Sequence, residues 1–213
     1  MAIIKAGILS KVSGKVAGVV GGTWKGKNYL RELVKPANPN TALQQAQRGK
    51  MGMVVGVARQ LVGDILNPYL NKFCKEMSGY NWFCKENISK ANPTAEKFTA
   101  PFQLTFGTMA TGALEDESLA NFNGFDFTAV PSVPAGHSLK LITCYISEDG
   151  LVRGIKTTNN PSDGVVYDED GFKIAELNGK KVRGYAFFAD FDANNVLQAI
   201  STSIYTDEIT VSV

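Results

Sequence analysis

The sequence has few of the residues on which enzyme chemistry and metal binding commonly depend. Its 213 residues include only three cysteines, Cys74, Cys84 and Cys144, and one histidine, His137. No CxxC spacing occurs and a single histidine cannot form a cluster, so there is neither a zinc-site pattern nor a disulfide framework. We therefore expect free, buried or half-buried thiols, no metal and no cofactor.

Long apolar runs are missing as well. No stretch of about 18 apolar residues occurs, as a membrane-spanning helix would require. Lys5, Lys11 and Lys15 interrupt the apolar residues near the N-terminus, whereas a secretory signal has an unbroken apolar region after its first positive charges. We expect no membrane span, no secretion signal and synthesis in the cytoplasm.

Acidic residues are scarce in the first 63 positions. This region contains ten basic residues and one acidic residue, Glu32, a net charge of +9, whereas residues 64–213 carry a net charge of −7. Such an asymmetry predicts a segment that contacts something negative. Nucleic acid and the acidic face of a neighbouring copy are both possible partners, and charge alone does not separate them.

Glycine and proline divide the chain into three predicted regions. Residues 1–40 form a basic, glycine-rich region that disfavours helix, because an interior glycine costs about 1 kcal/mol relative to alanine. We expect an extended arm or loose hairpin, with a turn at 25–28 between strands at Val19–Trp24 and Tyr29–Val34. Residues 41–92 predict a helical segment. Its expected pieces are Thr41–Leu66, ended or kinked at Asn67-Pro68, then about Tyr69–Met77 and Tyr80–Ile88.

Residues 97–213 predict an all-β domain, because short apolar or alternating runs are separated by turn residues such as Asn178-Gly179. The expected fold class is α+β, with a C-terminal immunoglobulin-like antiparallel β-sandwich. The last run ends the chain and could lie at a sheet edge. The predicted strands are Phe102–Phe106, Gly124–Val130, Leu139–Ser147, Leu151–Thr157, Phe172–Leu177, Val182–Phe188, Val196–Tyr205 and Glu208–Val213.

Three motifs suggest chemistry but lack essential parts. The GxxxxGK pattern beginning at Gly21 has Asn28 where a phosphate-binding loop needs Ser or Thr. The calcium-like run from Asp190 has Ser201 where a bidentate glutamate should stand. His137 would be the sole base for a catalytic triad, and its proline-glycine loop favours a surface histidine. We expect no catalytic residues and no enzyme activity.

The residues expected to contact a partner lie in the basic region and the first helix. Lysines and an arginine interleaved with aromatic residues can contact phosphates and stack on bases, or can face another subunit. Glycines on one helix face permit a backbone to pack closely. The candidates, for assembly or nucleic acid, are Lys15, Trp24, Lys25, Lys27, Tyr29, Arg31, Arg48, Gly52 and Gly56.

The N-terminal third carries a resemblance to a family. The order Ser13-Gly14-Lys15-Val16-Ala17-Gly18-Val19-Val20-Gly21, then Trp24-Lys25-Gly26-Lys27, Arg31, Asn38-Pro39-Asn40-Thr41, Gln44 and Arg48 resembles an uncharacterised family from Bacteroidetes and their phages. Tyr185-Ala186-Phe187-Phe188 and Ser201–Tyr205 are similar to that family's last two strands. The resemblance implies an architecture and a setting, and no activity.

Together these patterns predict a non-catalytic structural subunit of a phage virion or related self-assembling particle. It would pack through its N-terminal arm and exposed strand edges, with itself and other particle proteins as partners. Two alternatives stay open. One is a nucleic-acid-binding accessory protein that uses the basic residues 1–63. The other is a carbohydrate- or ligand-binding β-sandwich module.

Overall fold

A computed structural model describes residues 2–4, 13–24, 27–35, 37, 39–114, 125–162, 166–167 and 175–211. The chain divides into two compact units, Met1–Thr41 and Ala42–Val213. The second unit contains both the helices and the long β-strands, which the sequence pattern had assigned to separate regions at 41–92 and 97–213.

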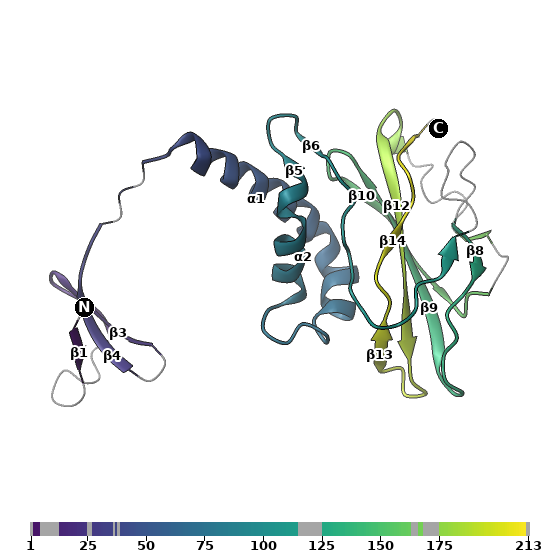
Figure 1. The fold of residues 1–213 in the computed structure, drawn as a ribbon, viewed down its shortest axis with the longest axis horizontal. Helices are drawn as coiled ribbons and strands as arrows, with labels where there is room; N and C mark the ends of the chain where they lie inside the picture. Colours follow the sequence, from purple (N-terminus) through teal and green to yellow (C-terminus); the bar gives the residue numbers. More distant parts are fainter. Residues whose placement is uncertain are drawn as a thin grey trace. The chain divides into compact units, whose positions relative to one another are not determined.

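The N-terminal unit is a four-stranded antiparallel sheet (Figure 1). Its strand order is β1-β4-β3-β2. The hairpin of β3 and β4 was expected, and β3 has the predicted bounds. The pairing of β1 with β4 joins distant segments and gave no local signal in the sequence. The strands are β1 (Ala2–Ile4), β2 (Gly14–Val16), β3 (Val19–Trp24) and β4 (Lys27–Glu32).

The second unit begins with helix α1 (Ala42–Leu61), which starts where the sequence predicts. The helix does not stop at Asn67-Pro68. It continues as a π-helix over Val62–Leu70 with Pro68 inside it. A proline has no N–H to donate and its ring crowds the preceding turn of an α-helix. The wider π turn, in which the Asn71 N–H reaches the Leu66 carbonyl at 3.2 Å, is one way to accommodate it.

The helix expected at Tyr69–Met77 is wrong, because residues 71–77 form turns and bends. Side chains take the backbone bonds there, which favours a turn over a helix. The Asn71 Oδ1 atom accepts from the Gly79 N–H at 2.7 Å, and the Ser78 hydroxyl accepts from the Asn81 N–H at 3.2 Å. Ser78 thereby caps α2 (Gly79–Asn87), which is followed by a 3₁₀ turn, Ile88–Lys90.

The centre of the second unit is an antiparallel sheet in the order β10-β9-β12-β13. Three short strands, β13, β14 and β15, pair successively with β12 and together make one border of the sheet. The bounds are β9 (Ser138–Ser147), β10 (Val152–Asn159), β12 (Lys181–Phe191), β13 (Leu197–Ile200), β14 (Ile204–Tyr205) and β15 (Ile209–Thr210).

This sheet is covered on both faces, so that the unit has three layers (Figure 1). Ile142, Cys144 and Phe187 belong to a core shared with α1, the π-helix and α2. Leu141 and Phe188 belong to a second core with a small sheet ordered β11-β8-β7. The small sheet comprises β7 (Ala113–Leu114), β8 (Phe125–Ala129) and β11 (Val166–Tyr167). The fold is therefore mixed α+β with mainly antiparallel sheets, compatible with a β-sandwich. Its immunoglobulin-like character stays a prediction.

The strand predicted at Phe102–Phe106 is extended but joins no sheet. Side chains satisfy its backbone instead. Buried Asn87 donates from Nδ2 to the Gln103 carbonyl at 3.0 Å and accepts the Gln103 N–H at 2.9 Å. The Phe102 N–H donates to the Tyr185 hydroxyl at 3.0 Å. A β5–β6 hairpin (Ala91–Asn92 and Lys97–Phe98) precedes the segment.

Two further strands differ from prediction. Of Phe172–Leu177, residues 172–174 lie outside the described structure and Ala175–Leu177 is a 3₁₀ turn. The run Val196–Tyr205 is interrupted between β13 and β14, where the Ser201 hydroxyl accepts from the Phe188 N–H at 2.9 Å. The three cysteines are free thiols, with Cys84 and Cys144 buried and Cys74 half-buried. Burial raises the pKa of Cys84, and a hydrogen bond with Tyr80 offsets part of that rise.

The two borders of the central sheet differ. On one side β10 carries a register irregularity between Arg153 and Lys156, and Gly154 within it has φ of +61°. On the other side the chain at 105–109 runs beside 200–203. There the Met109 N–H donates to the Ile200 carbonyl at 3.3 Å, and the Thr105 hydroxyl donates to the Ser201 carbonyl at 2.9 Å.

Candidate functional site: the two faces of the N-terminal sheet

Strand register brings predicted contact residues from three strands onto one face of the N-terminal sheet. Lys27, Tyr29 and Arg31 alternate along β4, and alternate residues of a strand point to the same side. Directly paired residues share a face, and Arg31 pairs with Val20, which pairs with Lys15. We call the side that carries Lys15, Lys27, Tyr29 and Arg31 the basic face.

The cations of the basic face are exposed, and no carboxylate from the described residues forms an ion pair with Lys15, Lys27 or Arg31. The unit's single acidic residue, Glu32, pairs with Val19 and therefore belongs to the opposite side. Positive charge on this face is thus not neutralised by neighbouring strands.

Tyr29 lies across the basic face rather than standing away from it. Its strand partner is Gly22, and a Cβ placed on Gly22 would come within 2.9 Å of the Tyr29 hydroxyl and 3.1 Å of Cζ. The tyrosine is half-buried. The absence of a side chain at Gly22 is what lets the ring approach the strand so closely.

The opposite side of the sheet carries exposed apolar residues next to the polar residues Thr23, Asn28 and Glu32. Val16, Val19 and Leu30 share it by register, and we call this the apolar face. Val16 is 62% exposed and Val19 is 40% exposed. Among the unit's described side chains no large residue is buried, and Gly21 is its one buried residue. The sheet thus has an apolar side without a core behind it.

The remaining predicted contact residues lie in different parts of the chain. Trp24 pairs with Lys27 at the end of the β3–β4 hairpin and so belongs to the side of the basic face by register, and Lys25 lies outside the described residues. Arg48, Gly52 and Gly56 belong to α1 in the other compact unit, and all three are exposed. Arg48, Gly52 and Gly56 therefore do not form part of the basic face.

The glycines of α1 were expected to permit close packing by another backbone. Within this chain, a Cβ on Gly52, Gly56 or Gly63 meets no described atom within 4 Å. A Cβ on Gly49 would meet the Pro93 side chain at 2.8 Å, and that neighbour is not backbone. Open space thus lies beside Gly52 and Gly56 within this unit, and close packing by another backbone there stays a prediction.

His137 is not the plain surface histidine that its loop suggested. Its Nδ1 atom lies 2.9 and 3.0 Å from the two carboxylate oxygens of Asp190, whose side chain is only 8% exposed. His137 borders an open hollow lined by Val130–Val133, Leu139 and Asn160–Ser162. Asp190 is the last residue but one of β12, and a charged residue after the apolar run of that strand was the one sequence signal for a buried pair.

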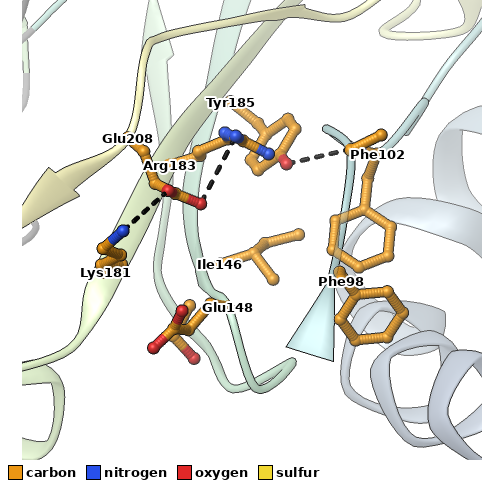
Figure 2. Close-up of a pocket in the computed structure, with 10 residues that line it drawn as sticks. Phe98, Phe102, Ile146, Glu148, Lys181, Arg183, Tyr185 and Glu208 are labelled. Atoms are coloured by element: carbon orange, nitrogen blue, oxygen red, sulfur yellow. Dashed lines mark hydrogen bonds and ion pairs between the residues drawn. The ribbon is translucent and has the colours of Figure 1, made fainter. Parts of the chain in front are cut away.

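A second polar cluster closes one end of the central sheet (Figure 2). Glu208 lies 3.6 Å from Lys181 Nζ and 3.4 Å from an Arg183 nitrogen. The cavity beside it has a volume of about 10 Å³, room for one water molecule. Burial raises the pKa of Tyr185, which also lines the cavity, far above its ordinary value. We interpret this cluster as structural.

The turn at this end of the sheet holds an ionised carboxylate. Asp149 accepts hydrogen bonds from Lys180 Nζ at 2.6 Å and from the Ser147 hydroxyl. Burial raises the pKa of Asp149, but the hydrogen bonds from Lys180 and Ser147 outweigh it, so the pKa lies below its ordinary value.

Within the described part of the chain, no group of three or more His, Cys, Asp or Glu side chains is arranged to hold a metal ion. No described helix has both the length and the apolar character needed to cross a membrane.

Comparison with known proteins gives one match. No curated protein and no solved structure shows significant similarity to the chain. A family model described as "Family of unknown function (DUF6266)" matches residues 11–106, which include β2 to β4, both helices and the extended segment through Phe106. The chain is therefore similar, over the part that carries the basic and apolar faces, to a family of unknown function.

Proposed function

We propose that this protein is a non-catalytic structural subunit of a self-assembling particle, in which the apolar face of the N-terminal sheet packs against a second copy. The observation that carries the proposal is a sheet of four strands with an exposed apolar side and no core. A unit of about 40 residues rarely folds alone without a disulfide, a metal or a partner. Sheets of this kind gain stability when a hydrophobic face is covered.

The charge distribution favours a second copy as the partner. The N-terminal unit carries seven basic residues and one acidic residue, a net charge of +6, and residues 42–213 carry −4, so an N-terminal unit is attracted at long range to the second unit of a neighbour. Such a contact joins different surfaces of two copies and repeats from one subunit to the next. It extends into rings, tubes or shells according to its geometry.

The setting is the finer part of the proposal. The motif order Ser13–Gly21, Trp24–Lys27, Asn38–Thr41 and Arg48 resembles proteins of Bacteroidetes and their phages, which makes a phage virion the particle we favour. An immunoglobulin-like sandwich would suit such a subunit. Localisation in an assembled particle after synthesis in the bacterial cytoplasm follows from the same proposal.

Matched valine-to-threonine substitutions test the contact, because threonine keeps the shape and strand preference of valine while adding a hydroxyl. Burying each hydroxyl without a partner costs about 1–3 kcal/mol. Sedimentation velocity and electron microscopy over a concentration series should show parent assemblies that dissociate in the double variant Val16→Thr/Val19→Thr. Val20→Thr makes the same chemical change on the basic face and should assemble like the parent.

Two results would overturn the proposal. One is a parent protein that stays monomeric across the whole concentration series. The other is a double variant that assembles as strongly as the parent, since the apolar face would then contribute nothing.

A further inference from the structure

We propose that the basic face of the N-terminal sheet binds single-stranded nucleic acid, with Tyr29 as a stacking platform for one base and Lys15, Lys27 and Arg31 as phosphate contacts. The inference goes beyond the proposed assembly, because it concerns the opposite face of the sheet. A two-sided sheet can pack on a protein with one side and hold a polyanion with the other.

The spacing of the basic face suits a strand of nucleic acid. Lys27 and Arg31 lie two positions before and after Tyr29 on β4, so each Cα is about 7 Å from that of the tyrosine. Lys15 lies in the row of Arg31, two strands away, or about 10 Å across the sheet. A base on the ring would therefore have a cation on either side for its flanking phosphates.

The position of the tyrosine ring distinguishes nucleic acid from an acidic protein. An acidic protein face needs cations and has no use for an aromatic ring held against the sheet. Every base has a π-face, and base–aromatic stacking is the common element of single-strand binding sites. Gly22, which a strand tolerates poorly, is what allows the ring to lie close to β3. Duplex DNA keeps its bases stacked internally and should bind more weakly.

Fluorescence anisotropy of the full-length protein with labelled oligothymidylate and oligouridylate tests the inference. Tyr29→Ile retains strand preference and removes the ring, so affinity should fall about 5- to 150-fold. Tyr29→Phe keeps the ring and should bind like the parent. Lys27→Gln and Arg31→Gln should each lower the slope of log affinity against log salt by about 0.7. Lys75→Gln removes the same charge from an exposed site in the other unit and should leave the slope unchanged.

Controls separate the outcomes. Circular dichroism of each variant confirms that the fold is retained. Equal affinities for Tyr29→Ile and Tyr29→Phe would overturn stacking, and displacement of the oligonucleotide by poly-glutamate at comparable charge would assign the face to an acidic protein. The Val16→Thr/Val19→Thr variant should still bind the oligonucleotide. Binding by this variant as a monomer separates the two proposals, because assembly can then fail while the basic face still functions.

Discussion

Replacing Gly22 with alanine should raise the stability of the N-terminal sheet and lower its affinity for single-stranded nucleic acid. The backbone at this position is not in the left-handed region, so alanine meets no backbone strain there. Glycine within a strand costs about 0.5–1 kcal/mol relative to alanine, and the substitution recovers that amount. The new Cβ would lie 2.9 Å from the Tyr29 hydroxyl, closer than real Cβ atoms approach, and 3.1 Å from Cζ, which is a tight contact.

Because the obstructing atoms are at the end of a flexible side chain, the ring moves and the strand stays. The affinity loss should approach that of Tyr29→Ile, about 5- to 150-fold, without any change in charge. Anisotropy titrations at fixed salt measure the affinity, and urea unfolding measures the stability. Unchanged affinity in a folded Gly22→Ala protein would refute the idea that ring position determines binding. Matching losses of affinity and stability would point to simple unfolding of the sheet.

Three further predictions concern the second unit. Asn87→Ala leaves both buried bonds to Gln103 unmade, at about 1–3 kcal/mol for each polar group. Asn87→Asp places a carboxylate oxygen against the Phe83 and Gln103 carbonyls at a fully buried position and should cost at least as much; urea unfolding ranks the two. His137→Ala removes the partner of the Asp190 carboxylate and should lower the free energy of unfolding by about 1–3 kcal/mol. If the buried charge of Asp190 is the cause, adding Asp190→Asn to the His137→Ala variant should restore that stability. The lowered pKa of Asp149 gives stability that is complete above its ordinary pKa of 3.8 and lost as pH falls through the folded-state value. Asp149→Asn should therefore flatten the acid limb of unfolding free energy against pH, and an unchanged limb would contradict the assignment.

Much of the fold could be predicted wherever a local pattern decided it. The bounds of β3 were predicted because glycine excluded helix and the following turn residues ended the strand. Helix α1 began at its predicted residue because a proline-rich segment precedes an apolar repeat. The main strands β9 and β12 were recognised, but their long apolar runs were assigned to a sandwich core. Such runs are typical of strands that are buried on both faces. Here the helices cover one face of the central sheet and the small sheet covers the other.

What could not be predicted depended on distant partners. Phe102–Phe106 has a strand's composition, yet its backbone bonds go to the side chains of Asn87, Tyr185 and Ser203, which no local pattern reveals. The pairing of His137 with Asp190 spans 53 positions. The basic face was predicted only as a set of residues. Its arrangement required the register of three strands, which places the cations on one side and Glu32 on the other.

The irregular border formed by β10 has a consequence for the behaviour of the central sheet at high protein concentration. A regular, exposed edge strand offers a row of unpaired amides to any other strand and so promotes amyloid-like aggregation. The bulge at Arg153–Lys156 and the left-handed Gly154 break that row, and two basic side chains flank it. The central sheet is thereby protected against uncontrolled strand addition at high local concentration. In the proposed particle, growth would then depend on surfaces whose geometry is specific.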